Sequence, residues 1–175
     1  SGDMDTMQLV TGDDVVVYTL KKGIKDIVIY DELAVIERFG FKPEFLTDYK
    51  GLRGDPSDNI IGIAGIGEKT ASIIINAFGT IDDMYGLLDK DPEEFRAKLK
   101  AAGMTDRIIG LLENGRDDAI FSKTLATIRR DAPINFDYEH AKWTPHLDKI
   151  ETLFKELEFR SLFAKVKQLI TGMEA

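Results

Sequence analysis

The chain has 175 residues, of which 43% are hydrophobic and 31% charged, and its formal net charge is −8. That length and composition fit a globular protein with a sizeable core. The absence of cysteine excludes disulfides and thiolate metal sites. The sequence shows neither a signal peptide nor an apolar run of membrane-spanning length, so we expect no membrane partner and a cytoplasmic location. The acidic charge argues weakly against a nucleic-acid-binding protein, because such proteins usually carry a basic face.

Residues 1–30 predict a short acidic segment followed by a β-hairpin. Asp3 and Asp5 flank Met4, so an extended backbone would place both carboxylates on one side. The alternative is that these two aspartates are simply solvated. Residues 15–20 and 24–30 predict two strands joined by a turn. The fold class predicted for the whole chain is mainly α with this small hairpin.

Helical patterns fill most of the remaining sequence. Asp31 is the expected N-cap of a helix that ends at Gly40, and Pro43 opens the next one. A helix over 68–78 should end at Gly79 and bury Ile73, Ile74, Ile75 and Phe78. Further helices are predicted over 80–89, 92–102, 104–128, 146–158 and 161–170.

Local signals refine the second half of the chain. Thr80, Asp91 and Thr105 are the expected N-caps of its first three helices. The charged stretch 113–118 should break or bend the long helical segment, and residues 131–145 should be irregular.

The segment 49–71 combines two features that rarely occur together by chance. Asp55 and Asp58 lie in a loop of Gly, Pro, Ser and Asn, and a turn containing Gly62, Gly65 and Gly67 leads directly into a helix. Glycine permits positive φ and close approach of another group, and a helix N-terminus presents N–H groups that suit a phosphate. The alternatives are an Asx-type turn for the aspartates and a ligand-free helix corner for the glycines. Together the two features indicate phosphodiester chemistry.

Two motifs here resemble those of the structure-specific 5′ nucleases, especially the 5′→3′ exonuclease domain of bacterial DNA polymerase I. The helix–three-turn–helix segment of that family is similar to Gly54-Asp55-Pro56-Ser57-Asp58-Asn59-Ile60 followed by Gly62-Ile63-Ala64-Gly65-Ile66-Gly67-Glu68-Lys69-Thr70-Ala71. Its D-x-D-x-x-Q-L segment resembles Asp3-Met4-Asp5-Thr6-Met7-Gln8-Leu9. The resemblance extends to residues 157–162. Ile61 stands where the family usually has proline, which should loosen the turn slightly.

The resemblance implies that Asp3, Asp5, Asp55 and Asp58 are metal ligands. Phosphodiester hydrolysis commonly uses two divalent ions about 4 Å apart, and Mg²⁺ prefers carboxylate oxygens. We therefore expect Mg²⁺ or Mn²⁺, with these four aspartates serving the second of two ions. Carboxylates that hold metal ions would also offset part of the acidic charge.

The same resemblance implies a site for duplex DNA. Backbone N–H groups near Gly62, Gly65 and Gly67 should face a phosphate, with Lys69 and Thr70 adding side-chain contacts and a K⁺ ion as a candidate bridge. Such contacts do not depend on base sequence.

Residues outside these motifs carry weaker signals. Lys21, Lys22 and Lys25, at the hairpin tip, are either solvated or near DNA. Trp143 is expected to pack rather than to stack on a base.

We expect residues 1–30 to end a nuclease α/β core, and residues 31–175 to form a helical C-terminal domain with the helix–three-turn–helix at 43–79. The chain then reads as the C-terminal part of a 5′→3′ exonuclease and flap endonuclease, inactive alone because the other metal ligands lie upstream. We expect a monomer that acts on 5′ ends or flaps, and a following polymerase is left open. The rival interpretation is a non-catalytic module that binds duplex DNA.

Overall fold

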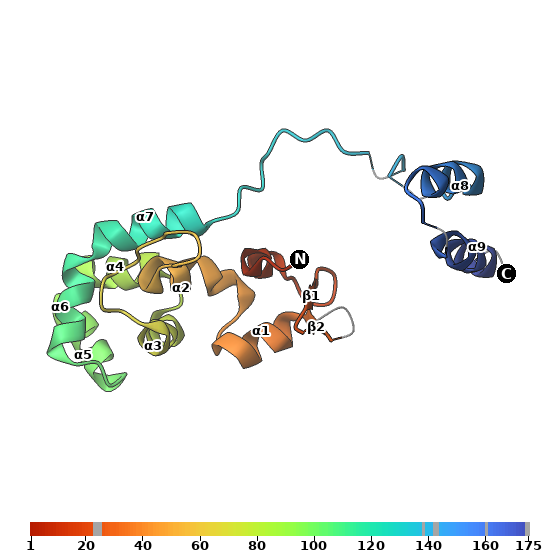
Figure 1. The fold of residues 1–175 in the computed structure, drawn as a ribbon. Helices are drawn as coiled ribbons and strands as arrows, with labels where there is room; N and C mark the ends of the chain where they lie inside the picture. The colour runs from red at the N-terminus through yellow and green to blue at the C-terminus, as the bar shows by residue number, and fades with distance from the viewer. Residues whose placement is uncertain (23–25, 138, 142–143, 160, 174–175) are drawn as a thin grey trace. The chain divides into compact units, whose positions relative to one another are not determined.

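A computed structural model describes residues 1–22, 26–137, 139–141, 144–159 and 161–173 (Figure 1). Contacts divide the chain into two compact units, Ser1–Arg130 and Asp131–Ala175. The domain division expected at residue 30 remains a prediction. Several residues that enter the sequence predictions lie outside the described part: Ile24, Lys25, Tyr138, Trp143 and Arg160.

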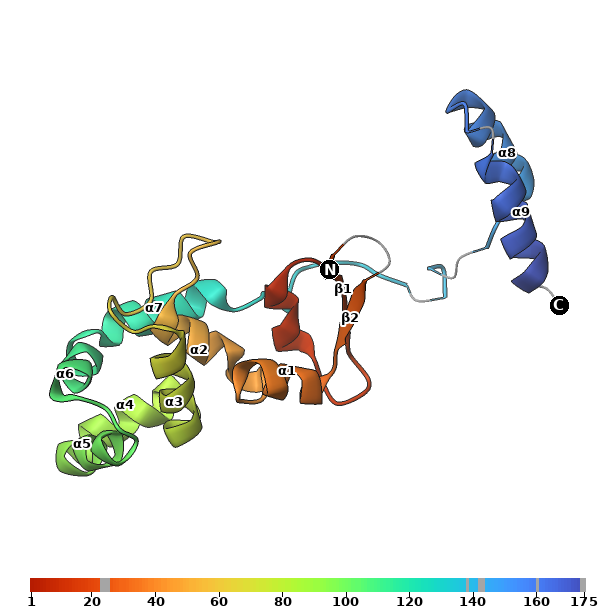
Figure 2. The same ribbon diagram turned by 60° about the horizontal axis from the view of Figure 1, so that its bottom comes forward.

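The first unit is mainly helical with one antiparallel hairpin, as the sequence predicts (Figures 1 and 2). Its elements are η1 (Met4–Leu9), β1 (Val17–Leu20), β2 (Ile27–Tyr30), α1 (Glu32–Phe39), η2 (Pro43–Phe45), α2 (Leu46–Arg53), α3 (Glu68–Phe78), α4 (Ile81–Lys90), α5 (Pro92–Ala101), α6 (Asp106–Asn114) and α7 (Arg116–Ala126). The hairpin register pairs Val17 with Tyr30 and Leu20 with Ile27.

The predicted helix ends are confirmed by their hydrogen bonds. The side chains of Asp31, Thr80, Asp91 and Thr105 each accept a backbone N–H from the residue three positions later. Such N-caps use one of the N–H groups that a helix leaves without an internal partner. The long segment predicted to break within 113–118 does so at Gly115, which separates α6 from α7.

The prediction of an extended backbone around Asp3 and Asp5 is wrong. Residues Met4–Leu9 form a 3₁₀ helix, and Asp3 is its N-cap. The Asp3 Oδ1 atom accepts the Asp5 N–H at 2.9 Å. An aspartate can cap its own chain two residues ahead, and here that local bond takes precedence over extension.

The core of the first unit is centred on α2. Figures 1 and 2 show α2 and α7 running side by side. A Cβ at Gly51 would lie 2.9 Å from the Ala119 carbonyl oxygen, so this glycine lets the two helices approach closely. The apolar side chains buried around them include Leu52, Ile63, Ile74, Met84, Phe95, Ile109 and Leu112.

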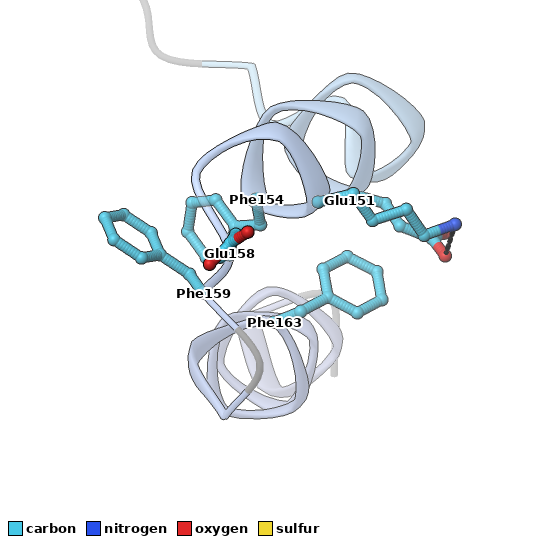
Figure 3. Close-up of a pocket in the computed structure, with 6 residues that line it drawn as sticks. Glu151, Phe154, Glu158, Phe159 and Phe163 are labelled. Carbon is cyan, nitrogen blue, oxygen red and sulfur yellow. Dashed lines mark ion pairs between the residues drawn. The ribbon is translucent and has the colours of Figure 1, made fainter.

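The second unit contains α8 (Leu147–Glu156) and α9 (Leu162–Met173), and residues 131–137 and 144–146 before them are irregular. Phe154 and Phe159 meet edge to face with ring centroids 5.5 Å apart. Figure 3 shows these rings and Phe163 around a hollow of about 360 Å³ between the helices. No helix in the described part of the chain is long and apolar enough to span a bilayer.

Candidate functional site

The loop that carries Asp55 and Asp58 is closed at its base by two glycines. Gly54 and Gly62 have φ of 78° and 65°. A Cβ on Gly62 would overlap the backbone of Gly54, and a Cβ on Gly54 would lie 2.5 Å from the Ile60 carbonyl oxygen. Just inside, Asp55 and Ile60 exchange backbone hydrogen bonds, with N···O distances of 2.8 and 2.9 Å. The loop is therefore fixed at both ends by its own backbone.

Inside the loop, the two carboxylate oxygens of Asp55 have different partners. Oδ1 accepts the Ser57 N–H at 3.0 Å and the Ser57 hydroxyl at 2.5 Å. This is the Asx-type turn that the sequence left open as an alternative. Oδ2 faces the Nζ of Lys50 at 2.7 Å. The turn occupies one oxygen of Asp55 and leaves the other for a cation.

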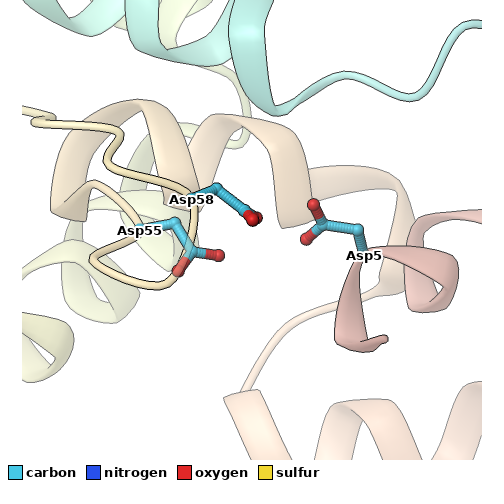
Figure 4. Close-up of side chains that lie close together, drawn as sticks. All are labelled: Asp5, Asp55 and Asp58. Carbon is cyan, nitrogen blue, oxygen red and sulfur yellow. The ribbon is translucent and has the colours of Figure 1, made fainter. Parts of the chain in front are cut away.

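Three of the four predicted metal ligands converge. A carboxylate oxygen from each of Asp5, Asp55 and Asp58 lies within 4.8 Å of the others. In Figure 4 the Asp5 and Asp58 carboxylates point toward one another, from η1 and from the loop. They line a shallow cavity of about 690 Å³. Asp3 also lines the cavity but is outside the group of three, and its Oδ1 caps η1.

Lys50 is a member of this cluster that sequence reasoning missed. Its side chain is 8% exposed and forms ion pairs with Asp5 and Asp55. Burial would raise the pKa of Asp55, but hydrogen bonds from Lys50 and Ser57 outweigh it and hold the pKa below its usual range. In the sequence, its one signal is a position in a helix whose neighbours, Tyr49 and Leu52, are apolar.

Gln8 anchors the segment that carries Asp5. Its amide nitrogen donates to the Ala126 carbonyl at 3.0 Å, and its amide oxygen accepts the Ile128 N–H at 2.9 Å. The Arg130 guanidinium donates to the Gln8 carbonyl at 2.7 Å. The glutamine of the D-x-D-x-x-Q-L pattern therefore fixes η1 against the end of α7.

The donor chemistry of the cluster fits a hard divalent cation. All three groups offer carboxylate oxygens, which Mg²⁺ and Mn²⁺ prefer over nitrogen or sulfur. Asp58 is exposed, and among the described residues it has no ion-pair partner. Asp5, Asp55 and Asp58 are thus the residues that could hold such an ion.

The glycine turn places its three glycines in different environments. The Gly62 N–H donates to the Ser122 hydroxyl at 3.0 Å, so that donor faces the protein interior. Gly65 has φ of 95°, and its Cβ position lies 3.0 Å from Leu111 Cδ1. Gly67 is the N-cap of α3, and a Cβ there would meet open space. The glycines whose N–H groups remain near the exposed surface are Gly65 and Gly67.

The N-terminus of α3 is open to a ligand. No described side chain caps it, and the first N–H groups of a helix have no partner within the helix. Lys69 is exposed and Thr70 partly so. Next to them lies a groove of about 280 Å³ lined by Arg38, Phe39, Tyr49, Glu68, Lys69 and Ser72. Tyr49 lines this groove. Burial raises the pKa of the Tyr49 hydroxyl to about 12, so this hydroxyl is neutral near pH 7.

The chain is similar to one nuclease family and to several bacterial DNA polymerases. The family described as "5'-3' exonuclease, C-terminal SAM fold" matches residues 41–149. DNA polymerase I of Bacillus caldotenax is 41% identical over 168 residues, and that of Bacillus subtilis (strain 168) is 37% identical over 167. Each alignment covers 95% of this chain and 18% of the relative. A thermostable DNA polymerase I of Thermus thermophilus is 35% identical over 126 residues, 72% of this chain and 14% of the relative.

The chain therefore spans less than a fifth of the length of these relatives. The family match covers both α2 and α3 and the loop between them, which hold Asp55, Asp58 and the glycine turn. From the matched range and the shared identity, the chain belongs to the 5′–3′ exonuclease family with the C-terminal SAM fold.

Proposed function

We propose that this chain is part of a metal-dependent nuclease that acts on 5′ ends and flaps of duplex DNA, as a 5′→3′ exonuclease and flap endonuclease. The observation that carries the proposal is the convergence of Asp5 with Asp55 and Asp58. The loop that holds the last two leads through the glycine turn to the open N-terminus of α3. Membership in the family supports a nuclease that binds DNA.

In the first half of the proposal, the aspartates bind Mg²⁺ or Mn²⁺. When bound, a divalent cation supplies charge neutralisation on the phosphate and a hydroxide at neutral pH. Asp5, Asp55 and Asp58 hold it, and Asp3 at the rim orients Asp5 by capping η1. This ion is the second of two, and the ligands of the first would come from other segments of the complete nuclease, as the family resemblance implies. In this role the aspartates increase the rate of cleavage and contribute little to DNA affinity.

In the second half, the start of α3 binds the duplex. Its free N–H groups, with those of Gly65 and Gly67 in the turn before it, donate to a phosphate. A K⁺ ion held by main-chain carbonyl oxygens is a candidate bridge to the same phosphate. Lys69 and Thr70 add side-chain contacts, while Gly62 shapes the turn through its bond to Ser122. None of these groups reads base edges, so binding is independent of sequence. A monomeric state and a domain division at residue 30 belong to the same proposal.

The experiment separates cleavage from binding in the complete nuclease. Asp58→Ala and Asp55→Ala should each lower single-turnover cleavage of a 5′-flap substrate at saturating enzyme by at least about a hundredfold, with little change in flap affinity. Asp82→Ala, which changes an aspartate that is 72% exposed on α4, is the matched control and should leave both unchanged. The chain of residues 1–175 alone should bind duplex DNA without cutting it.

Two outcomes would contradict the proposal. If Asp58→Ala abolishes flap binding while bound DNA is cut at the parent rate, the aspartates do not serve catalysis. If the complete protein binds duplex DNA but never cleaves it with Mg²⁺ or Mn²⁺, the rival interpretation holds, and the chain belongs to a non-catalytic DNA-binding module.

A further inference from the structure

Lys50 occupies an unusual position for a lysine. Its side chain is 8% exposed, and its ammonium group forms ion pairs with Asp5 and Asp55, whose side chains are 18% and 13% exposed. A buried charge is costly unless it is paired, so this contact is a stable part of the fold. It brings together η1 and α2, which carry no other described ion pair to one another.

The oxygen atoms that Lys50 contacts are those that a metal ion would need. Asp55 Oδ1 is engaged by the N–H and the hydroxyl of Ser57, so Oδ2 is the oxygen left for a cation. Lys50 Nζ lies 2.7 Å from that Oδ2 and also contacts Asp5 Oδ1. Asp58, the third member, is exposed and lies outside this pair of contacts. An ammonium group and a divalent ion would thus compete for the same two carboxylates.

We propose that Lys50 is an internal cation that competes with the divalent ion for Asp5 and Asp55. Without a divalent ion it contacts two of the three clustered carboxylates, offsets one of their negative charges, and keeps η1 and the loop in register. When the ion binds, the ammonium group must release at least one of these oxygens, which its flexible four-carbon stem permits. Lys50 therefore lowers the affinity of the site for metal and makes the empty site stable. This inference rests on the proposed function, because it requires the aspartates to bind a metal.

The test removes the charge of Lys50 and measures metal binding directly. Lys50→Met keeps the length of the apolar stem. Mn²⁺ binding to residues 1–175 is measured by calorimetry and by the resonance signal of free Mn²⁺, and thermal unfolding is followed in EDTA and in Mn²⁺. We expect the Kd for Mn²⁺ to fall by about tenfold or more, the midpoint in EDTA to drop, and the upward shift caused by Mn²⁺ to grow.

Lys123→Met is the matched control. Lys123 also bridges two aspartates, Asp48 at 2.8 Å and Asp82 at 2.6 Å, but these lie outside the cluster. Its loss should lower the unfolding midpoint in EDTA without changing the Kd for Mn²⁺. Lys50→Gln, which is neutral but can still hydrogen-bond both carboxylates, serves if Lys50→Met does not fold in EDTA; it too should bind Mn²⁺ more tightly.

The outcomes distinguish this inference from the function on which it rests. If the parent chain binds Mn²⁺, Asp58→Asn weakens that binding, and both Lys50 variants bind no more tightly than the parent, competition by Lys50 is overturned alone. If neither the parent nor the Lys50 variants bind millimolar Mn²⁺, the metal half of the proposed function fails, and this inference fails with it. Tight binding that appears only after Lys50 is changed supports the competition.

Discussion

At the residue scale, the glycines at positions 54, 62, 65 and 67 have different structural roles, although the sequence alone does not distinguish them. Gly54 and Gly62 allow two backbone segments to touch, which closes the loop around Asp55 and Asp58. Gly65 takes a left-handed conformation. Gly67 needs neither, since its φ is −94° and its Cβ position is open. Spacing alone does not separate these roles, because each depends on what lies opposite the glycine in the folded chain.

The contact between Gly54 and Gly62 leads to the first prediction. Gly62→Ala should destabilise the chain by at least about 2 kcal/mol, because the methyl group would overlap the Gly54 backbone and the residue would be held at positive φ. Gly67→Ser is the matched change in open space and should leave stability equal or slightly higher, since serine is a good N-cap. Urea unfolding of both variants checks this. Equal stability of Gly62→Ala and the parent would show that the loop does not depend on the close approach.

A second prediction concerns DNA binding at the start of α3. Gly67→Val should fold normally yet weaken duplex binding, because its side chain would project into the space where a phosphate would approach. Lys69→Ala should weaken binding less and flatten the log–log salt dependence by about one unit. Duplex affinity across a salt series measures both, with Lys90→Ala on α4 as the control. Parent-like affinity of a folded Gly67→Val would mean that this turn is a helix corner without a ligand.

At the element scale, one buried aspartate joins three helices. Asp48 of α2 is 2% exposed, and its Oδ1 accepts the Ile81 N–H at the start of α4 at 2.9 Å. The same oxygen lies 2.8 Å from the Nζ of Lys123 on α7. Burial would lower the pKa of Lys123, but Asp48 and Asp82 outweigh it and the pKa is raised. The charge of Lys123 is therefore retained at the junction of α2, α4 and α7.

This junction gives a third prediction with an internal comparison. Asp48→Ala should destabilise the chain by about 3–5 kcal/mol, because it removes a buried partner and leaves the Ile81 N–H unpaired. Asp82→Ala removes the other partner of Lys123, which is 72% exposed, and should cost less than about 1 kcal/mol. Chemical denaturation of the two variants gives the comparison. Similar losses would place the stabilisation in Lys123 alone rather than in the buried contact.

Elements with strong local signals could be predicted from the sequence, and the positions where the helices begin were predicted best. Thr80, Asp91 and Thr105 cap as predicted because a cap depends on residues within one turn. Ile74 and Ile75 are buried as predicted, but Ile73 and Phe78 are only partly so. Leu33 is an apolar residue of α1 three positions before Ile36, at helical spacing, yet it is 75% exposed. Sequence periodicity predicts which residues share a helical face, but it does not predict which other elements bury that face.

The residues of the candidate site also fall into those that the sequence could predict and those that it could not. Asp55 and Asp58 share a short loop, so their proximity could be anticipated, and Asp5 was reached through resemblance. The cap at Asp3 was missed because the alternation of Asp3, Met4 and Asp5 suggested an extended backbone. The ion pairs of Lys50 could not be anticipated, since one of them joins α2 to a residue 45 positions earlier. A contact between segments that are distant in the sequence produces no periodic pattern from which it could be predicted.

At the scale of the whole molecule, nearly all of the buried core belongs to Ser1–Arg130. In α8 none of the described residues is fully buried, and in α9 Ile170 is buried at 3% exposure. Residues 131–137, which follow the first unit, are all exposed. Most of the buried apolar side chains that stabilise the fold therefore lie in the first unit.

The fourth prediction follows from this distribution. Limited proteolysis should cut within 131–137 before it cuts the helices of the first unit, because exposed irregular backbone is accessible to proteases. A chain ending at Arg130 should unfold cooperatively, with a midpoint within a few degrees of that of residues 1–175. Mass spectrometry of the first fragments and a thermal melt provide the measurements. A truncated chain without a cooperative transition would show that the first unit needs the second in order to fold.

The bonds of Gln8 have a consequence for when the site forms. Its amide partners lie 118 and 120 residues further along the chain, at Ala126 and Ile128. A ribosome adds about 5–20 residues per second, so on the order of 10 s passes between synthesis of Gln8 and of its partners. Asp5, three residues before Gln8, lacks this anchor during that time. The anchor of η1 is then made late in synthesis, after α7 has emerged, and a nascent chain stalled before that helix would have the contact of Asp5 with Lys50 but not the anchor through Gln8.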